Sequence, residues 1–238
     1  MRRRTKQFLQ KMEHTMGRAR DEFDFWWGTS GSWVEPPNVR RSGTSGVQLI
    51  VQGDKTFFVK RQTGHLFRSL RYPTGRPTAL REGVALSRLE QLGVNAPRPV
   101  FYGARKVDGL WQGVLVTEDL GGFIDLDTWY GQGAASLLTT AQHLRLLERL
   151  AQMLARLHSG KWQHGCMRSK HIFIKASITD ADFDFELALL DLEKSRGRAT
   201  AMGAARHDIP QLRRHSFWDE SQWRHFLSCY EQALGRTL

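Results

Sequence analysis

Four side chains that can bind a metal or accept a proton occur in one part of the chain. His164, Cys166 and His171 lie close together in the sequence, and Asp191 follows a run of apolar residues. Imidazole, thiol and carboxylate groups are the ones that proteins use as proton acceptors, nucleophiles and metal ligands. We therefore expect the chemistry of this protein to depend on these four residues.

The spacing of these residues matches a loop that carries out phosphoryl transfer in kinases. That loop reads H-R-D-x-x-x-x-N, and His164 and His171 stand seven residues apart at its first and last positions. Cys166 stands where the aspartate that accepts the proton of the substrate belongs. The spacing predicts a kinase-like catalytic loop whose base is altered or lost.

The residues around this position suggest how a metal would be held. Asp191 is expected at a strand end, where its carboxylate can bind Mg²⁺ that bridges nucleotide phosphates. His171 stands in the place of a second metal ligand, although imidazole suits Mg²⁺ less well than oxygen does. We expect His164 to order the loop by hydrogen bonding, and Asp208 either to anchor the loop or to cap the next helix.

Two roles are open for Cys166. It could serve as the base if His164, Arg168 and Lys170 favour its thiolate form, or it could be an inert, packed cysteine. A positioned base contributes about 10²- to 10⁴-fold in rate, whereas phosphoryl transfer depends mainly on positioning and charge neutralisation. Slow transfer without the aspartate is therefore compatible with the sequence.

The first half of the chain has the pattern of strands and one helix that would position a nucleotide. Residues 47–51 and 56–60 predict a hairpin, and residues 78–93 predict a helix. Lys60 ends the second strand, and Glu82 in the helix is its expected ion-pair partner, as in the pair that holds a kinase lysine on the phosphates. The small residues just before the hairpin could approach phosphate through their backbone, and the candidates are Gly43, Ser45 and Gly46.

Further elements complete a two-lobed α+β arrangement. Strands are predicted at 97–102 and 110–117, and a long helix at 142–158. The polar segment after the strand at 110–117 is the expected hinge, in which the backbone of Glu118 and Leu120 would bind the adenine. We expect a basic and aromatic leader at residues 1–35 and a kinase-like domain at 36–238, with lobes of about 36–118 and 119–238.

Composition limits the compartment and the partners. The chain has 35 Lys and Arg against 24 Asp and Glu, a net charge of +11, which favours anionic partners. Its two cysteines have no zinc-finger or disulfide pattern, and neither an export signal nor an apolar run of about 18 residues is present. We expect a cytoplasmic monomer that meets an anionic membrane surface through its charge. The leader's tryptophans either cap the core or contact a membrane.

The motifs together resemble the bacterial lipopolysaccharide kinase (Kdo/heptose kinase) family, InaA branch. The resemblance covers roughly residues 35–225 and is carried by the segments 36–47, 58–62, 163–173 and 190–194. It implies a bilobal protein-kinase-like fold and, in active members, ATP-dependent phosphorylation of Kdo or heptose in the lipopolysaccharide inner core at the cytoplasmic face of the inner membrane. A histidine at His171 agrees with the family, whereas active members carry aspartate at Cys166.

Three functions follow from these observations. The first is a kinase that uses ATP and Mg²⁺ on a lipopolysaccharide-core sugar or a related acceptor. The second is a pseudokinase that binds nucleotide or acts as a scaffold without transferring phosphate, because Cys166 replaces the catalytic aspartate. The third, a nucleic-acid binder, rests on net charge alone, and we expect no nucleic-acid partner.

Overall fold

The computed structural model describes residues 19–40, 43–178 and 183–238, which form two compact units. The first unit contains the described residues up to Gly83 together with Pro99–Asp119, and the second contains Val84–Arg98 and Leu120–Leu238. Helix α2 (Thr78–Gln91) begins in the first unit and ends in the second. The first unit is rich in strands and the second in helices, which confirms the α+β class predicted from the sequence.

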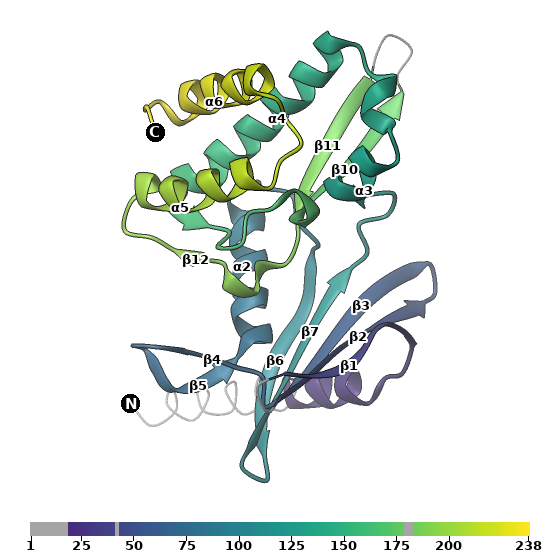
Figure 1. The fold of residues 1–238 in the computed structure, drawn as a ribbon. Coiled ribbons are helices and arrows are strands. Elements are labelled where there is room, and N and C mark those ends of the chain that lie inside the picture. The colour runs from purple at the N-terminus through teal and green to yellow at the C-terminus, as the bar shows by residue number, and fades with distance from the viewer. Residues whose placement is uncertain (1–18, 41–42, 179–182) are drawn as a thin grey trace, which may run out of the picture. The chain divides into compact units, whose positions relative to one another are not determined.

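The first unit is built on a five-stranded antiparallel sheet in the order β1-β2-β3-β7-β6 (Figure 1). Lys60 on β3 lies opposite Val47 on β2 and opposite Leu115 on β7, so the strand that carries the lysine is central and held on both sides. A separate hairpin, β4 with β5, follows β3. The strands of this unit are β1 (Ser32–Arg40), β2 (Gly43–Gln52), β3 (Lys55–Thr63), β4 (Leu66–Ser69), β5 (Tyr72–Pro77), β6 (Pro99–Val107) and β7 (Leu110–Glu118).

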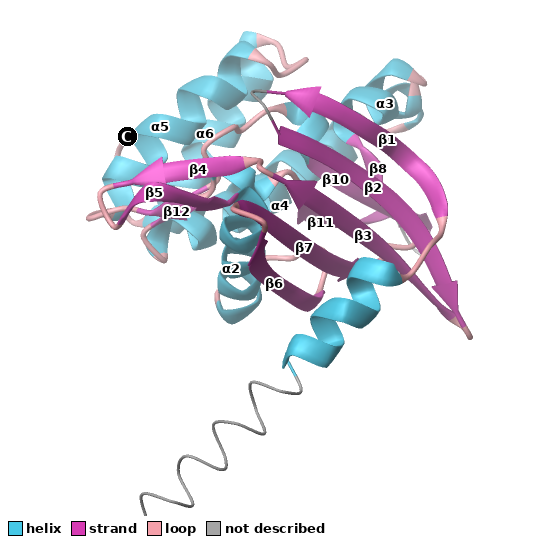
Figure 2. Ribbon diagram, turned by 90° about the horizontal axis from the view of Figure 1, so that it is seen from below, coloured by secondary structure: helices cyan, strands magenta, loops and turns pink. Residues whose placement is uncertain are grey.

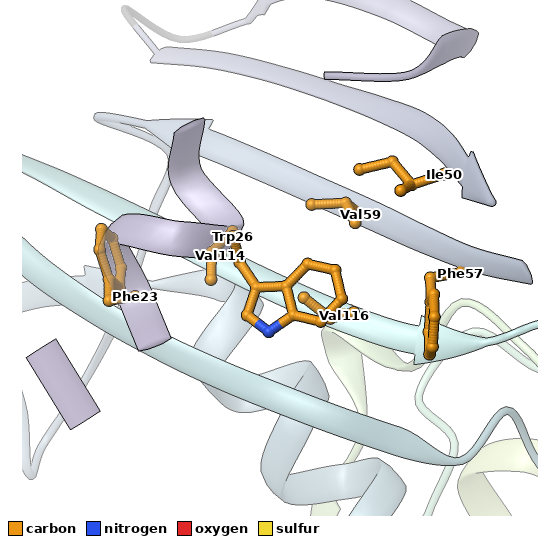
Figure 3. Packing of buried hydrophobic residues seen from close by; sticks show 7 residues of the cluster. All are labelled: Phe23, Trp26, Ile50, Phe57, Val59, Val114 and Val116. Atoms are coloured by element: carbon orange, nitrogen blue, oxygen red, sulfur yellow. The ribbon is translucent and has the colours of Figure 1, made fainter. Parts of the chain in front are cut away.

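A helix at residues 19–28 lies across one face of this sheet (Figure 2). Phe23 and Trp26 point from the helix onto apolar side chains of β2, β3 and β7 (Figure 3). Arg61 on β3 donates hydrogen bonds to the carbonyl oxygen of Trp26, at 3.1 and 2.9 Å, so a cation sits at the C-terminal end of the helix, where the helix dipole favours it. The cluster contains Phe23, Trp26, Ile50, Phe57, Val59, Val114 and Val116.

The aromatic residues of the predicted leader therefore divide into two groups. Phe23 and Trp26 are buried in the core of the first unit, as one of the two interpretations of the leader required. Phe25 and Trp33 are about half exposed. Strand β1 runs through the expected boundary at residues 35 and 36, because its backbone pairs with β2 on both sides of that point. The basic residues 2–4 lie outside the described residues.

The second unit combines helices with two small sheets (Figure 1). Helix α4 begins with a capping box at Thr139 and packs along α6, and its buried leucines at intervals of three and four form the apolar face predicted from the sequence. No helix among the described residues is long and apolar enough to cross a bilayer. The elements are β8 (Ile124–Asp125), α3 (Leu126–Gly131), α4 (Thr140–Ser159), β9 (Trp162–Gln163), β10 (Ile172–Ile178), β11 (Phe183–Leu189), β12 (Arg196–Gly197), α5 (Ala201–Arg214) and α6 (Glu220–Leu234), with short 3-10 helices at Ala134–Leu137, Ser169–His171 and Leu192–Lys194.

Candidate active site

The ion pair expected between Lys60 and Glu82 is present in the first unit. Lys60 Nζ lies 2.9 Å from Glu82 Oε2, and the two side chains are only 19% and 12% exposed. Partial burial matters here, because ion pairs in full contact with water contribute little, whereas a shielded pair holds its geometry. The lysine is therefore held by β3 and by the first turns of α2.

A second contact fixes α2 against β3. The side-chain oxygen of Gln62 accepts hydrogen bonds from the backbone N–H of Ala79, at 2.9 Å, and from the hydroxyl of Thr78, at 2.8 Å. Gln62 is 1% exposed and lies two residues beyond Lys60, so the two side chains share one face of β3. It serves as a distant cap for the start of α2, a role that the sequence reasoning missed, since neither a local motif nor periodicity marks such a residue.

The small residues proposed for phosphate binding lie inside β2, which begins at Gly43 and not at Val47 as expected. A Cβ at Gly43 would meet the backbone of Gly64 and His65 at 2.7 Å, and one at Gly46 would meet the Trp33 ring at 2.8 Å. Both glycines are thus required by the packing of the protein on itself. Ser45 Oγ lies 3.4 Å from Gln62 Nε2.

The expected hinge begins where β7 ends. Glu118 is the last residue of β7, and its Oε1 lies 3.4 Å from Lys55 Nζ. The backbone of the next residue, Asp119, donates to Thr56 O at 3.0 Å. Leu120, the first residue of the second unit's longer segment, accepts a hydrogen bond from the Phe123 N–H in a turn. The adenine-binding role of Glu118 and Leu120 stays a prediction.

In the second unit, Asp208 holds the predicted catalytic loop. Its carboxylate accepts hydrogen bonds from the backbone N–H groups of His164, at 2.6 Å, and Gly165, at 3.0 Å. The side chains of His158 and His207 contact the same carboxylate, at 3.3 and 2.9 Å. Asp208 lies in the interior of α5, whose N-cap is Thr200, so the alternative that Asp208 caps the helix is wrong.

The environment of Asp208 keeps its carboxylate charged. Burial alone would raise the pKa of this group, but the hydrogen bond and charge of His158 and the hydrogen bond of His207 outweigh that effect and lower the pKa to about 2. The two backbone N–H groups that donate to the carboxylate also stabilise its ionised form. The loop is therefore tied to α5 by a charged group that has no contact with water, since Asp208 is 0% exposed.

His164 orders the loop and is not placed to react. It is fully buried, and burial lowers its pKa, so the ring is neutral at physiological pH. Its Nε2 lies 2.8 Å from the carbonyl oxygen of Leu190 and must donate, because a carbonyl only accepts. Nδ1 then carries the lone pair and accepts the Cys166 N–H at 3.3 Å. Both ring nitrogens are occupied by the backbone.

Cys166 and His171 are joined through the backbone as well. His171 Nδ1 lies 2.7 Å from the carbonyl oxygen of Cys166, so Nδ1 carries a proton. The rings of His164 and His171 stack with centroids 5.8 Å apart, and each ring forms one hydrogen bond with the backbone of Cys166. The peptide that presents the Cys166 thiol is therefore fixed at both its N–H and its C=O.

Asp191 completes a cluster with these two residues. It lies two residues beyond the end of β11, with φ at +58°, and its Oδ2 is 3.2 Å from His171 Nε2. The ligand atoms of Cys166, His171 and Asp191 all lie within 4.8 Å of one another. The structure thus brings together the two predicted metal ligands and the cysteine that stands in the place of the base. Asp191 is exposed, whereas His171 is buried.

The fold that carries these residues is that of the kinases. A solved structure described as "WaaP in complex with acyl carrier protein" superposes with a TM-score of 0.69 at 20% identity, covering 89% of this chain and 82% of that one. A match at that identity establishes the fold, which confirms the predicted bilobal protein-kinase-like class.

The chain belongs to the lipopolysaccharide kinase (Kdo/WaaP) family, whose model matches residues 24–230. It is 44% identical over 195 residues to Protein InaA of Escherichia coli (strain K12), covering 82% of this chain and 88% of that protein. It is 24% identical over 153 residues to lipopolysaccharide core heptose(I) kinase WaaP of the same strain, covering 61% of this chain and 57% of that enzyme. The family resemblance drawn from the motifs is therefore confirmed, and membership supports a kinase-type function.

Proposed function

We propose that this protein is an ATP-dependent kinase that phosphorylates a sugar of the lipopolysaccharide inner core, Kdo or heptose, or a related acceptor. The observation that carries the proposal is the convergence of Cys166, His171 and Asp191 on a loop anchored by Asp208, at the positions of a kinase catalytic loop and metal aspartate. The Lys60–Glu82 ion pair supports it from the first unit. Family membership supports a phosphotransferase in general and leaves the acceptor open.

The residues fit Mg²⁺ in part. Mg²⁺ is usually held by one or two carboxylates together with substrate phosphates and water. The exposed carboxylate of Asp191 meets this preference, whereas His171 Nε2 and Cys166 Sγ are softer donors. Asp191 is therefore the residue that would hold Mg²⁺, which when bound neutralises phosphate charge that develops during transfer.

The remaining roles belong to the residues of this chain. Lys60, oriented by Glu82, would bind the phosphates of ATP, and the backbone around Glu118 and Leu120 would bind its adenine. Gly43, Ser45 and Gly46 would bring backbone N–H groups near the phosphates. His164 holds the loop through its contact with the Leu190 carbonyl.

Cys166 would then be the group nearest to the acceptor hydroxyl. As a thiolate it would accept the hydroxyl's proton, and as a thiol it would leave positioning and charge as the only sources of catalysis. In the second case transfer would be slower by about 10²- to 10⁴-fold than with a carboxylate base.

The alternative is a pseudokinase that binds nucleotide or acts as a scaffold without transferring phosphate. The replacement of the catalytic aspartate by Cys166 favours the pseudokinase, because the aspartate is the group that accepts the proton of the substrate hydroxyl in kinases. Both proposals predict nucleotide binding, and they differ only in transfer.

One experiment separates the proposals. Purified protein is incubated with ATP labelled at the γ-phosphate, with Mg²⁺ and with deep-rough lipopolysaccharide, and the labelled lipid is separated and counted. Label in the sugar core supports the kinase. Nucleotide binding without label, even at long incubation, supports the pseudokinase, and the absence of nucleotide binding contradicts both. The same preparation with RNA or DNA as competitor tests the expectation that no nucleic acid is bound.

We also propose that the protein acts in the cytoplasm as a monomer, peripheral at the inner membrane, because its proposed acceptor is a lipid and its net charge is +11. Sedimentation of cell fractions in buffers of low and high salt would test this location.

A further inference from the structure

We propose that Cys166, His171 and Asp191 form a binding site for a thiophilic divalent cation of the Zn²⁺ class, selective against Mg²⁺. The inference goes beyond the kinase function, because it concerns cation binding by the chain alone, without nucleotide. The site shares Cys166, His171 and Asp191 with the proposed kinase centre. Cation binding is measured here without ATP or an acceptor, so the failure of this proposal can be distinguished from the failure of the kinase proposal.

The tautomer of His171 suits a metal ligand. Its Nδ1 donates to the Cys166 carbonyl oxygen, so in a neutral ring the lone pair lies on Nε2. A zinc-binding histidine commonly has this arrangement, in which the nitrogen away from the metal donates to a carbonyl or carboxylate. His171 is therefore held in the tautomer that a metal ligand needs.

The Nε2 atom of His171 faces a carboxylate oxygen. It lies 3.2 Å from Asp191 Oδ2, and a lone pair facing a carboxylate oxygen is repelled by it. Either a proton or a metal cation must mediate this contact. Two ligands at about 2.0 to 2.1 Å from a tetrahedral zinc are themselves about 3.3 Å apart, so the observed separation suits a cation bound by both atoms.

The thiol of Cys166 can supply a third ligand. Cys166 Sγ lies within 4.8 Å of both other ligand atoms, and rotation about its side-chain bond can bring it toward a shared cation. Its peptide is fixed by His164 and His171, so only the thiol has to move. A thiolate and an imidazole favour Zn²⁺ over Mg²⁺, because Mg²⁺ prefers hard oxygen donors.

Three protein ligands would leave a coordination position open for water or an anionic oxygen, as in catalytic zinc sites.

A free cysteine elsewhere in the chain provides a matched control. Cys229 Sγ lies 3.6 Å from His225 Nε2 on α6, so this cysteine also lies beside a histidine. Among the described residues, no third histidine, cysteine or carboxylate joins this pair in a cluster that could hold a metal.

The test uses the full chain, without a polyhistidine tag and stripped of metal. Zn²⁺ is titrated against a chromophoric chelator, and Co²⁺ is titrated while its visible bands and its thiolate charge-transfer band are recorded. We expect one tightly bound cation per chain, a charge-transfer band, and no displacement by a large excess of Mg²⁺. Cys166→Ser should abolish the band and weaken Zn²⁺ binding by about tenfold or more, whereas Cys229→Ser should change neither.

A second measurement needs no variant. Wild-type protein is alkylated with and without Zn²⁺, and the modified cysteines are identified by peptide mass analysis. Zn²⁺ should slow the modification of Cys166 and leave that of Cys229 unchanged. The proposal is overturned if Zn²⁺ does not bind, if it protects Cys229 alone, or if Mg²⁺ competes with it at equal concentration.

Discussion

Lys60 on β3 and Glu82 on α2 are joined by a 2.9 Å ion pair, and the same strand caps the same helix through Gln62. The lysine's position thus depends on how β3 and α2 pack together. Two contacts of different chemistry, one charged and one neutral, fix this packing within the first unit.

The ion pair should control nucleotide binding. We expect Lys60→Met to weaken ATP binding by about tenfold or more, because it removes a charge from the phosphates, and Glu82→Gln to weaken it less. The double variant should be less than additive, since both changes break one interaction. Lys55→Met is the control, because Lys55 forms a more exposed ion pair from the same strand, with Glu118. Equal binding by Lys60→Met and wild type, measured by calorimetry, would remove the kinase interpretation.

Gln62 should contribute to stability through the start of α2. Gln62→Leu keeps most of the volume but leaves the Ala79 N–H without its buried partner, which we expect to lower the free energy of unfolding by roughly 1 to 3 kcal/mol. Gln52→Leu, at the exposed end of β2, should change it by less than about 0.5 kcal/mol. Urea unfolding monitored by tryptophan fluorescence measures both. If Gln62→Leu lowers the free energy of unfolding no more than Gln52→Leu does, the hydrogen bond of Gln62 to the start of α2 contributes nothing to stability.

Asp208 should make stability depend on pH in acid. Its pKa is lowered from 3.8 to about 2 in the folded chain, so the folded state favours the ionised form. The resulting stability, roughly 2 kcal/mol, is fully present above pH 3.8, decreases as the pH falls toward 2, and is absent below that.

Asp208→Asn removes this titration. The stability difference between wild type and Asp208→Asn should therefore be constant near neutral pH and shrink between about pH 4 and pH 2. Asp54→Asn, in the exposed β2–β3 turn, is the control and should leave the acid dependence unchanged. Urea unfolding midpoints of wild type and Asp208→Asn, measured across this pH range, test the prediction. A stability difference that does not change with pH would show that Asp208 does not cause the acid dependence.

Cys166 can be tested by replacing it in two directions. Cys166→Asp supplies a carboxylate where kinases have one, and we expect transfer to rise by about 10²-fold. The change also replaces the sulfur donor beside Asp191 with carboxylate oxygens, which should favour Mg²⁺ over Zn²⁺ in this cluster. Cys166→Ser should abolish transfer and keep ATP binding if a thiolate is the base, because a hydroxyl is too weak an acid to replace it. If neither variant changes transfer and wild type has none, the protein is a pseudokinase.

The β4–β5 hairpin should contribute to membrane association. Leu70 at its tip is fully exposed between Arg68 and Arg71, while Arg76 stacks on Trp111 with 4.9 Å to the ring centroid. The double variant Arg68→Ser, Arg71→Ser should bind anionic vesicles more weakly, by up to about 1 kcal/mol per arginine. Added salt should lower the vesicle affinity of the wild type until it approaches that of the variant. Arg224→Ser on α6 is the control. Binding that salt does not reduce would assign the contact to apolar side chains instead.

The sequence alone determined the parts of this protein that depend on spacing within one or two neighbouring elements. His164, Cys166 and His171 could be predicted to share one loop because they form a short, continuous motif, and the role of that loop in catalysis stays a prediction. The hairpin of β2 and β3, helix α2 and helix α4 could be placed because alternation and the 3.6-residue period report which side chains are buried. Lys60 and Glu82 could be paired because each lies in such an element.

The tertiary structure decided what lies far apart in the chain. Asp208 holds His164 from 44 residues away, inside a helix, and Gln62 caps α2 from a strand, so neither has a local signal. Gly43 and Gly46 at the start of β2 are required by the crowding of β1 and of residues 64 and 65, which spacing cannot reveal. The meeting of the Cys166 thiol with Asp191 likewise depends on the turn after β11, because a side chain's neighbours follow from how the chain folds back on itself and not from its own propensities.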